Sequence, residues 1–196
     1  MQTNKLRVQK ITGLGLFSAA VILLQFVSMS LRFTTFSITL TLIPIVVGAA
    51  VYGIGGGAWL GLVFGLAVLM TGDAAAFLAI SIPGTIITVL AKGVLAGVAS
   101  GAIFRLLEKK NRTVASVAAA MICPVVNSGV FFLGCLTFFI SEIKLWALTD
   151  FGDNVVLYIL FALIGFNFIL EFAINAIFSP MVTYVIGVGK KILFKQ

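Results

Sequence analysis

The stretch VASVAAAMICPVVNSGVFFLGCLTFFI, residues 114–140, decides the fold class because it contains no charged residue. A helix needs about 20 apolar residues to cross the hydrocarbon core of a bilayer, and this stretch is long enough. Of all 196 residues, 61% are hydrophobic and 10% are charged, and the mean hydropathy is +1.22. These values are typical of an integral membrane protein and exclude an ordinary soluble domain.

Further apolar runs on both sides of this stretch predict an all-α bundle of six transmembrane helices, with residues 1–196 forming a single integral membrane domain. The six runs are residues 11–29, 38–52, 58–70, 84–107, 114–140 and 155–188. The second and third are shorter than a standard span, and the glycine-rich segment 53–57 between them predicts a tight turn. The first run follows basic residues, as in a signal peptide, but it is longer than a signal core, so we expect it to be retained as helix 1.

The distribution of the net charge of +7 predicts the orientation of the bundle. Basic residues gather before the first run, in one central connection and at the end of the chain: Lys5, Arg7, Lys10, Arg105, Lys109, Lys110, Arg112, Lys190, Lys191 and Lys195. By the positive-inside rule both termini and the central connection are cytoplasmic. The basic charge is therefore explained by topology and by membrane lipid, and we expect no nucleic-acid partner.

Small residues recur at every fourth position on three of the predicted helices. The sets are Gly57, Gly61 and Gly65; Gly93, Gly97 and Gly101; and the pair Gly15 and Ala19. Such spacing lets another helix approach closely within a membrane. We expect the first two sets to pack inside the bundle, and the helix 1 pair to pack there or against a partner protein.

Two ionisable residues, Lys92 and Glu171, lie inside the predicted spans, where a charge is costly and usually functional. Counted from the cytoplasmic helix ends at about 1.5 Å per residue, Lys92, Asn127 and Glu171 all fall roughly 20 to 25 Å up, in the outer half of the bilayer. Helical spacing places further residues on the same faces: Thr85 and Thr88 with Lys92, Phe131 with Asn127, and Asn167 and Asn175 with Glu171.

These residues at one depth predict a substrate pocket open to the outside. In this pocket Lys92 would bind a carboxylate of the substrate, and the neighbouring polar groups would form hydrogen bonds with it. The external segments 30–37, which contains Arg32, and 71–82 are candidate lids. The alternative is an ion pair between Lys92 and Glu171 that only fixes the bundle. The sequence has no histidine, no P-loop and no nucleophile–base pair, so we expect no catalytic residue, cofactor or metal site.

Several motifs together resemble the S components of energy-coupling factor (ECF) transporters, the vitamin-binding membrane subunits of bacterial uptake systems. The resemblance extends over residues 10–187 and includes Ile43-Pro44-Ile45-Val46-Val47-Gly48-Ala49, Gly61-Leu62-Val63-Phe64-Gly65-Leu66 and the helix 1 pair. In the family that pair is usually Ala-x-x-x-Ala and contacts the transmembrane coupling subunit, which implies the same role for Gly15 and Ala19.

Within this family the chain is most similar to the pantothenate group. Val89-Leu90-Ala91-Lys92 stands where that group tends to have Val-Leu-Pro-Arg, and Asn127-Ser128 where it has Asn-Thr. Glu171 is followed by Ser179-Pro180 where that group has Thr-Pro. Lysine in place of arginine keeps the positive charge but loses the bidentate fork for a carboxylate.

The resemblance implies a substrate-binding subunit of the bacterial cell membrane that captures a vitamin from outside, topples in the membrane and delivers it through a coupling subunit with two ATPases. ATP hydrolysis is then expected in those partners. The resemblance supports Lys92, Asn127 and Glu171 as substrate-binding residues, and helical spacing and the first external segment add Asn167, Thr88, Phe131 and Arg32. Other substrates, a proton-coupled carrier using Lys92 and Glu171, and a small membrane enzyme or assembly factor remain as alternatives.

Overall fold

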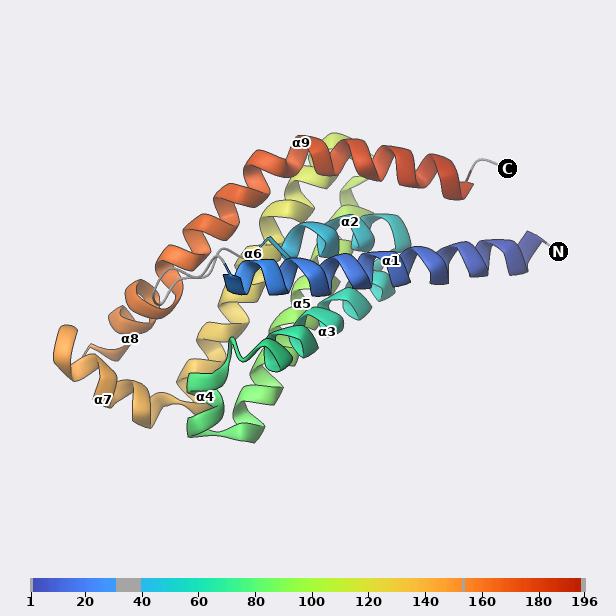
Figure 1. Ribbon diagram of the computed structural model, residues 1–196. Coiled ribbons are helices and arrows are strands. Elements are labelled where there is room, and N and C mark those ends of the chain that lie inside the picture. The colour runs from blue at the N-terminus through green and yellow to red at the C-terminus, as the bar shows by residue number, and fades with distance from the viewer. Residues whose placement is uncertain (1, 31–39, 153, 195–196) are drawn as a thin grey trace.

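The fold is a bundle of helices, shown in Figure 1 as a computed structural model that describes residues 2–30, 40–152 and 154–194. Every regular element in those ranges is helical, which confirms the all-α prediction. The elements are α1 (Gln2–Ser30), α2 (Leu42–Tyr52), α3 (Ile54–Thr71), α4 (Ala75–Ile80), α5 (Ile82–Leu107), α6 (Arg112–Phe138), α7 (Ile140–Asp150), α8 (Val155–Tyr158), the π-helix η1 (Ile159–Gly165) and α9 (Phe166–Phe194).

The described chain has 5 segments that are long and apolar enough to cross a membrane. They are Arg7–Ser30, Ile54–Thr71, Ile82–Leu107, Arg112–Phe138 and Val155–Gly189. These segments correspond to the first, third, fourth, fifth and sixth predicted runs. Many large apolar side chains of these segments are exposed on the outside of the bundle, as expected where lipid rather than water surrounds it.

The second predicted run differs from a full span, because α2 is only 11 residues long. At 1.5 Å per residue it measures about 16 Å, roughly half the thickness of a bilayer core. Its side chains are buried at nearly every position from Leu42 to Val51, and it contacts α1, α3, α5, α6 and α9. A helix that is apolar all round belongs in the interior. Five of the six predicted runs therefore form helices long and apolar enough to span a membrane, while the second run forms a short central helix.

The glycine-rich segment between α2 and α3 makes a tight turn, as predicted. Gly53 is the single residue between the two helices and has a φ of 83°. This left-handed conformation is costly for residues that carry a Cβ atom. The turn lets α3 fold back along α2 with no extended loop.

The glycines of α3 and α5 face one another, which confirms the prediction that they pack inside the bundle. A Cβ atom on Gly61 would collide with the carbonyl oxygen of Gly93, and one on Gly57 would collide with that of Gly97. Backbone contact at this range is possible only without side chains. The α3–α5 pair therefore forms a rigid wall of the bundle.

The two ends of the bundle differ in character. Figure 1 shows the first turns of α1 and the last turns of α9 on one side, and α4, α7 and α8 on the opposite side. Arg112, at the start of α6, donates a hydrogen bond from Nη2 to the carbonyl oxygen of Ile186 on α9 (2.8 Å), so the basic α5–α6 connection lies at the same end as the close of α9. The basic α5–α6 connection therefore lies beside the last turns of α9.

Candidate functional site

The inward face of α9 is polar in the middle of an otherwise apolar helix. Glu171, Asn175 and Ser179 are buried at successive turns, and Val182 and Ile186 continue the same face toward the C-terminus. The i, i+4 spacing places them in one row because an α-helix has 3.6 residues per turn. Asn175 and Ser179 donate to carbonyl oxygens of α9 itself, whereas Glu171 has a partner on a neighbouring helix.

Asn127 on α6 provides the partner for Glu171. Its Nδ2 atom donates a hydrogen bond to Glu171 Oε2 at 3.2 Å, and the two side chains are 4% and 6% exposed. The sequence analysis placed both residues at one depth, and the structure brings them into contact. This bond joins α6 to α9 in the interior of the bundle.

Lys92 of α5 approaches the same region from a third helix. Its ammonium lies 5.7 Å from the ring centroid of Phe64 and 5.3 Å from that of Phe131, both within the range of cation–π attraction. The carboxyl group of Glu171 is near enough to interact with Lys92 electrostatically. Helices α5, α6 and α9 therefore contribute one charged or amide side chain each to a common site.

The other predicted site residues occupy different positions around this centre. Thr88 is 3% exposed, packs against Gly134 of α6, and its hydroxyl has no hydrogen-bond partner in the described part of the chain. Asn167 lies one turn before Glu171 on α9 and is partly buried. Arg32 falls outside the described residues, as does most of the first candidate lid.

An aromatic cluster covers the site on the side of α4 and α7. Phe77 of α4 is its centre, with ring centroids 5.3 Å from Phe131, 5.0 Å from Phe139 and 6.1 Å from Trp146, all edge to face. Such pairs are favourable beyond their apolar area. Phe131 also makes the cation–π contact with Lys92. The cluster therefore connects the cation to the second candidate lid, residues 71–82, which contains α4.

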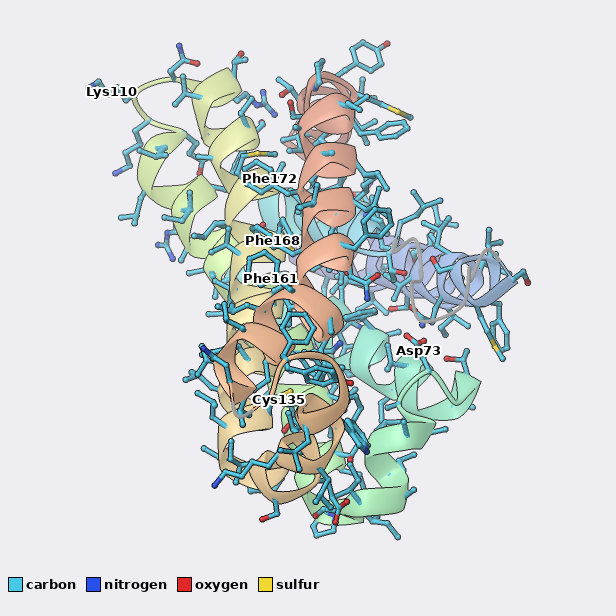
Figure 2. The ribbon with its side chains drawn as sticks, turned by 90° about the vertical axis from the view of Figure 1, so that its left-hand side faces the viewer. Asp73, Lys110, Cys135, Phe161, Phe168 and Phe172 are labelled. Atoms are coloured by element: carbon cyan, nitrogen blue, oxygen red, sulfur yellow. The ribbon has the colours of Figure 1, made fainter. Side chains whose placement is uncertain are left out.

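A π-helix precedes the polar face of α9. Residues Ile159–Gly165 form η1, and a Cβ atom on Gly165 would lie 2.6 Å from the carbonyl oxygen of Leu160. π-Helical turns are rare overall, and those that occur are often found at functional sites. The extra residue in the turn changes which side chains face inward. Figure 2 shows Phe161, Phe168 and Phe172 following one another along η1 and α9, on the side of the molecule that faces the viewer.

A second polar cluster, which the sequence analysis missed, connects α1 to the α3–α4 turn. Gln25, 2% exposed, accepts a hydrogen bond from Thr41 Oγ1 at 3.2 Å and donates one from Nε2 to Asp73 Oδ2 at 3.5 Å. The signal available in the sequence was a glutamine inside an apolar run. Figure 2 labels Asp73 beside this turn.

Gly15 and Ala19 both lie on the exposed side of α1, where no atom comes within 4 Å of a Cβ placed on Gly15. The neighbouring Gly13 instead faces Tyr52 of α2. The two cysteines, Cys123 and Cys135, are free, and each is buried in one of the two hydrophobic clusters of the described chain. Among the described residues no group of three or more His, Cys, Asp or Glu side chains comes together.

Comparison with known proteins identifies the family. A family model described as "ECF transporter, substrate-specific component" matches residues 9–187, nearly the whole chain. No curated protein and no solved structure matches. Members of this family bind a transport substrate and are not enzymes. The chain therefore belongs to the ECF transporter substrate-specific component family and is a substrate-binding subunit of a multi-pass membrane transporter.

Proposed function

We propose that this subunit captures a small carboxylate of the pantothenate type from outside the cell and delivers it through a coupling subunit driven by two ATPases. The observation that carries the proposal is the hydrogen bond between Asn127 and Glu171 inside an apolar bundle, with Lys92 of a third helix near enough to Glu171 to interact with it electrostatically. Polar groups in a membrane interior are expensive and are usually functional.

Lys92 is the residue best suited to an anionic group. Its ammonium lies over two phenylalanine rings. Ring faces attract a cation but give weaker and less directed contacts than a carboxylate, which accepts short charge-assisted hydrogen bonds. A substrate carboxylate would therefore gain from Lys92, while the rings keep the ammonium in place.

The remaining site residues suit the uncharged part of the substrate. Asn127 and Glu171 present amide and carboxylate oxygens, and Thr88 presents a buried hydroxyl without a partner in the described chain. Asn167 extends the polar face one turn further toward η1, and Phe131 supplies an apolar wall. Arg32 is proposed to act from the first external segment.

The proposed orientation follows from the charge pattern. The end that carries the basic segments faces the cytoplasm, so the termini are cytoplasmic, and the end with α4 and α7 faces outward. Both termini on one side require an even number of passes, so the second run, which contains α2, is proposed as the second of six passes, and the membrane is proposed to be the bacterial cytoplasmic membrane. Substrate then enters from the side covered by the aromatic cluster.

The proposed contact with the coupling subunit is the exposed side of α1 around Gly15 and Ala19. Small exposed residues on an apolar helix allow a second helix to approach closely. ATP hydrolysis is assigned to the partner subunits.

Two measurements test this function. Isothermal titration calorimetry of the detergent-purified protein should detect saturable binding of pantothenate. Uptake by vesicles should require the coupling subunit and the ATPases. Uptake that continues without those partners and follows a proton gradient would instead support a secondary carrier using Lys92 and Glu171, and binding of only uncharged or cationic compounds would exclude a carboxylate substrate.

A further inference from the structure

Asn175 is a buried amide whose orientation is fixed by one hydrogen bond. The side chain is 0% exposed, and Nδ2 donates to the carbonyl oxygen of Glu171 at 2.8 Å. Turning the amide over would place Oδ1 against that carbonyl oxygen, and two acceptors repel each other. The Nδ2 atom therefore stays on the helix backbone. Asn175 Oδ1 points elsewhere and has no hydrogen-bond partner in the described part of the chain.

Asn127 is fixed in the same way from the opposite helix. Its Nδ2 donates to Glu171 Oε2, so its Oδ1 faces away from the carboxylate, and this atom too is buried with no partner among the described residues. The two amides thus meet at Glu171, one at its backbone and one at its side chain. Each amide donates a hydrogen bond from Nδ2 to Glu171, and its Oδ1 atom accepts none from the described residues.

Two buried acceptors without a hydrogen-bond partner are costly. A buried polar atom without a partner costs about 1–3 kcal/mol. Lipid offers no hydrogen-bond partner to such atoms, so a partner has to come from protein, from ligand or from water held in the site. Two such atoms, each on an amide that donates to Glu171, indicate a site that lacks donors rather than acceptors.

We propose that the site selects its substrate by hydrogen-bond donors, with Asn175 Oδ1 and Asn127 Oδ1 accepting from hydroxyl or amide N–H groups of the ligand. Asn175 is then a specificity-determining residue, one turn deeper than the proposed ring of Lys92, Asn127 and Glu171. This inference rests on the proposed function for the location of the site. It adds that the substrate carries at least two donors apart from its carboxylate, and that carboxylates with an apolar remainder are rejected.

The first test needs no variant of the protein. The affinity of the purified wild-type protein is measured by calorimetry for pantothenate and for its analogue in which both hydroxyl groups are replaced by hydrogen. A site built to bind substrate hydroxyl groups rejects an analogue without them strongly, so we expect affinity to fall at least about 100-fold. Lipoate and nicotinate, carboxylates without donors, should not bind, whereas biotin and pyridoxine extend the comparison to other donors.

The outcomes separate this inference from the proposed function. If a donor-bearing compound without a carboxylate, such as pyridoxine, is the one bound, the carboxylate proposal fails and donor selection stands. If lipoate, nicotinate or the analogue without hydroxyl groups binds as tightly as pantothenate, donor selection is overturned and the carboxylate proposal stands.

The second test assigns the selection to Asn175. Asn175→Ala should weaken pantothenate binding about tenfold and leave the affinity for the analogue without hydroxyl groups unchanged, because only pantothenate loses a hydrogen bond. Ser179→Ala is the matched control: Ser179 is buried one turn further along the same face, and its hydroxyl already donates to the carbonyl oxygen of Ala176 at 2.8 Å. An equal loss for both ligands in Asn175→Ala would show a purely structural role and overturn the assignment.

Discussion

Asn127 and Glu171 are joined across α6 and α9 by a hydrogen bond of 3.2 Å between Nδ2 and Oε2, and both side chains are buried. The two residues are far apart in the sequence, and their meeting fixes two of the three helices that form the proposed site. Because the bond involves a carboxyl group, its loss should affect stability as well as binding.

Replacement of Asn127 by alanine should therefore destabilise the protein. It removes the amide that solvates the buried Glu171 side chain, and we expect a loss of about 2 kcal/mol, measured as a lower thermal unfolding temperature in detergent. Ser128→Ala, at the next position of α6, is the control and should change little. An unfolding temperature equal to that of the wild type would show that the bond does not hold the helices together.

Substitutions of Lys92 should separate charge from shape. Lys92→Met keeps an unbranched side chain of similar length and should abolish carboxylate binding while the protein still inserts and stays monodisperse. Lys92→Arg keeps the cation and should retain binding. Calorimetry measures both, with Lys144→Met, on the exposed surface of α7, as the control. Unchanged affinity in Lys92→Met would rule out a role for the ammonium.

The contact between α3 and α5 should be intolerant of even one methyl group. Gly61→Ala would press a Cβ atom into the carbonyl oxygen of Gly93, and we expect a loss of about 1–3 kcal/mol with less folded protein on size-exclusion chromatography. Gly129→Ala on α6 is the matched control, because no atom lies within 4 Å of its added Cβ. Equal behaviour of the two variants would contradict the close approach of these helices.

Docking should be separable from ligand binding. Gly15→Leu adds a bulky side chain to the exposed side of α1, where there is room within the subunit itself. Ligand affinity should stay at the wild-type value, whereas co-purification with the coupling subunit and two ATPases should be lost. Leu23→Ala, on an exposed position of the same helix, serves as the comparison. Normal assembly of the Gly15→Leu complex would place the contact elsewhere.

Much of the fold could be predicted from the sequence because lipid imposes simple rules on length and charge. The long apolar runs predicted the spanning helices, and Gly53 predicted the turn. The central position of α2 could not be predicted, since an apolar run alone does not show whether lipid or protein surrounds it. The π-helix η1 was also missed, because its extra residue per turn leaves no mark in hydrophobicity.

For similar reasons the proximity of two candidate site residues could be predicted, whereas their role in binding stays a prediction. Equal depth along three helices placed Lys92, Asn127 and Glu171 at one level, and the structure brings Asn127 and Glu171 together. Depth in the membrane does not determine the direction in which a side chain points. The aromatic rings around Lys92 and the unpartnered Oδ1 atom of Asn175 could therefore not be predicted from the sequence. Gln25 was overlooked because its partners, Thr41 and Asp73, come from separate parts of the chain.

The central claim is that Lys92, Asn127 and Glu171 hold a small carboxylate, and mass spectrometry of the compound that co-purifies with the protein tests it most directly. Wild-type protein should release a water-soluble carboxylate that also carries hydroxyl or amide groups, and Lys92→Met prepared in parallel should release none. Recovery of a compound without a carboxylate, or of equal amounts from both proteins, would contradict the account.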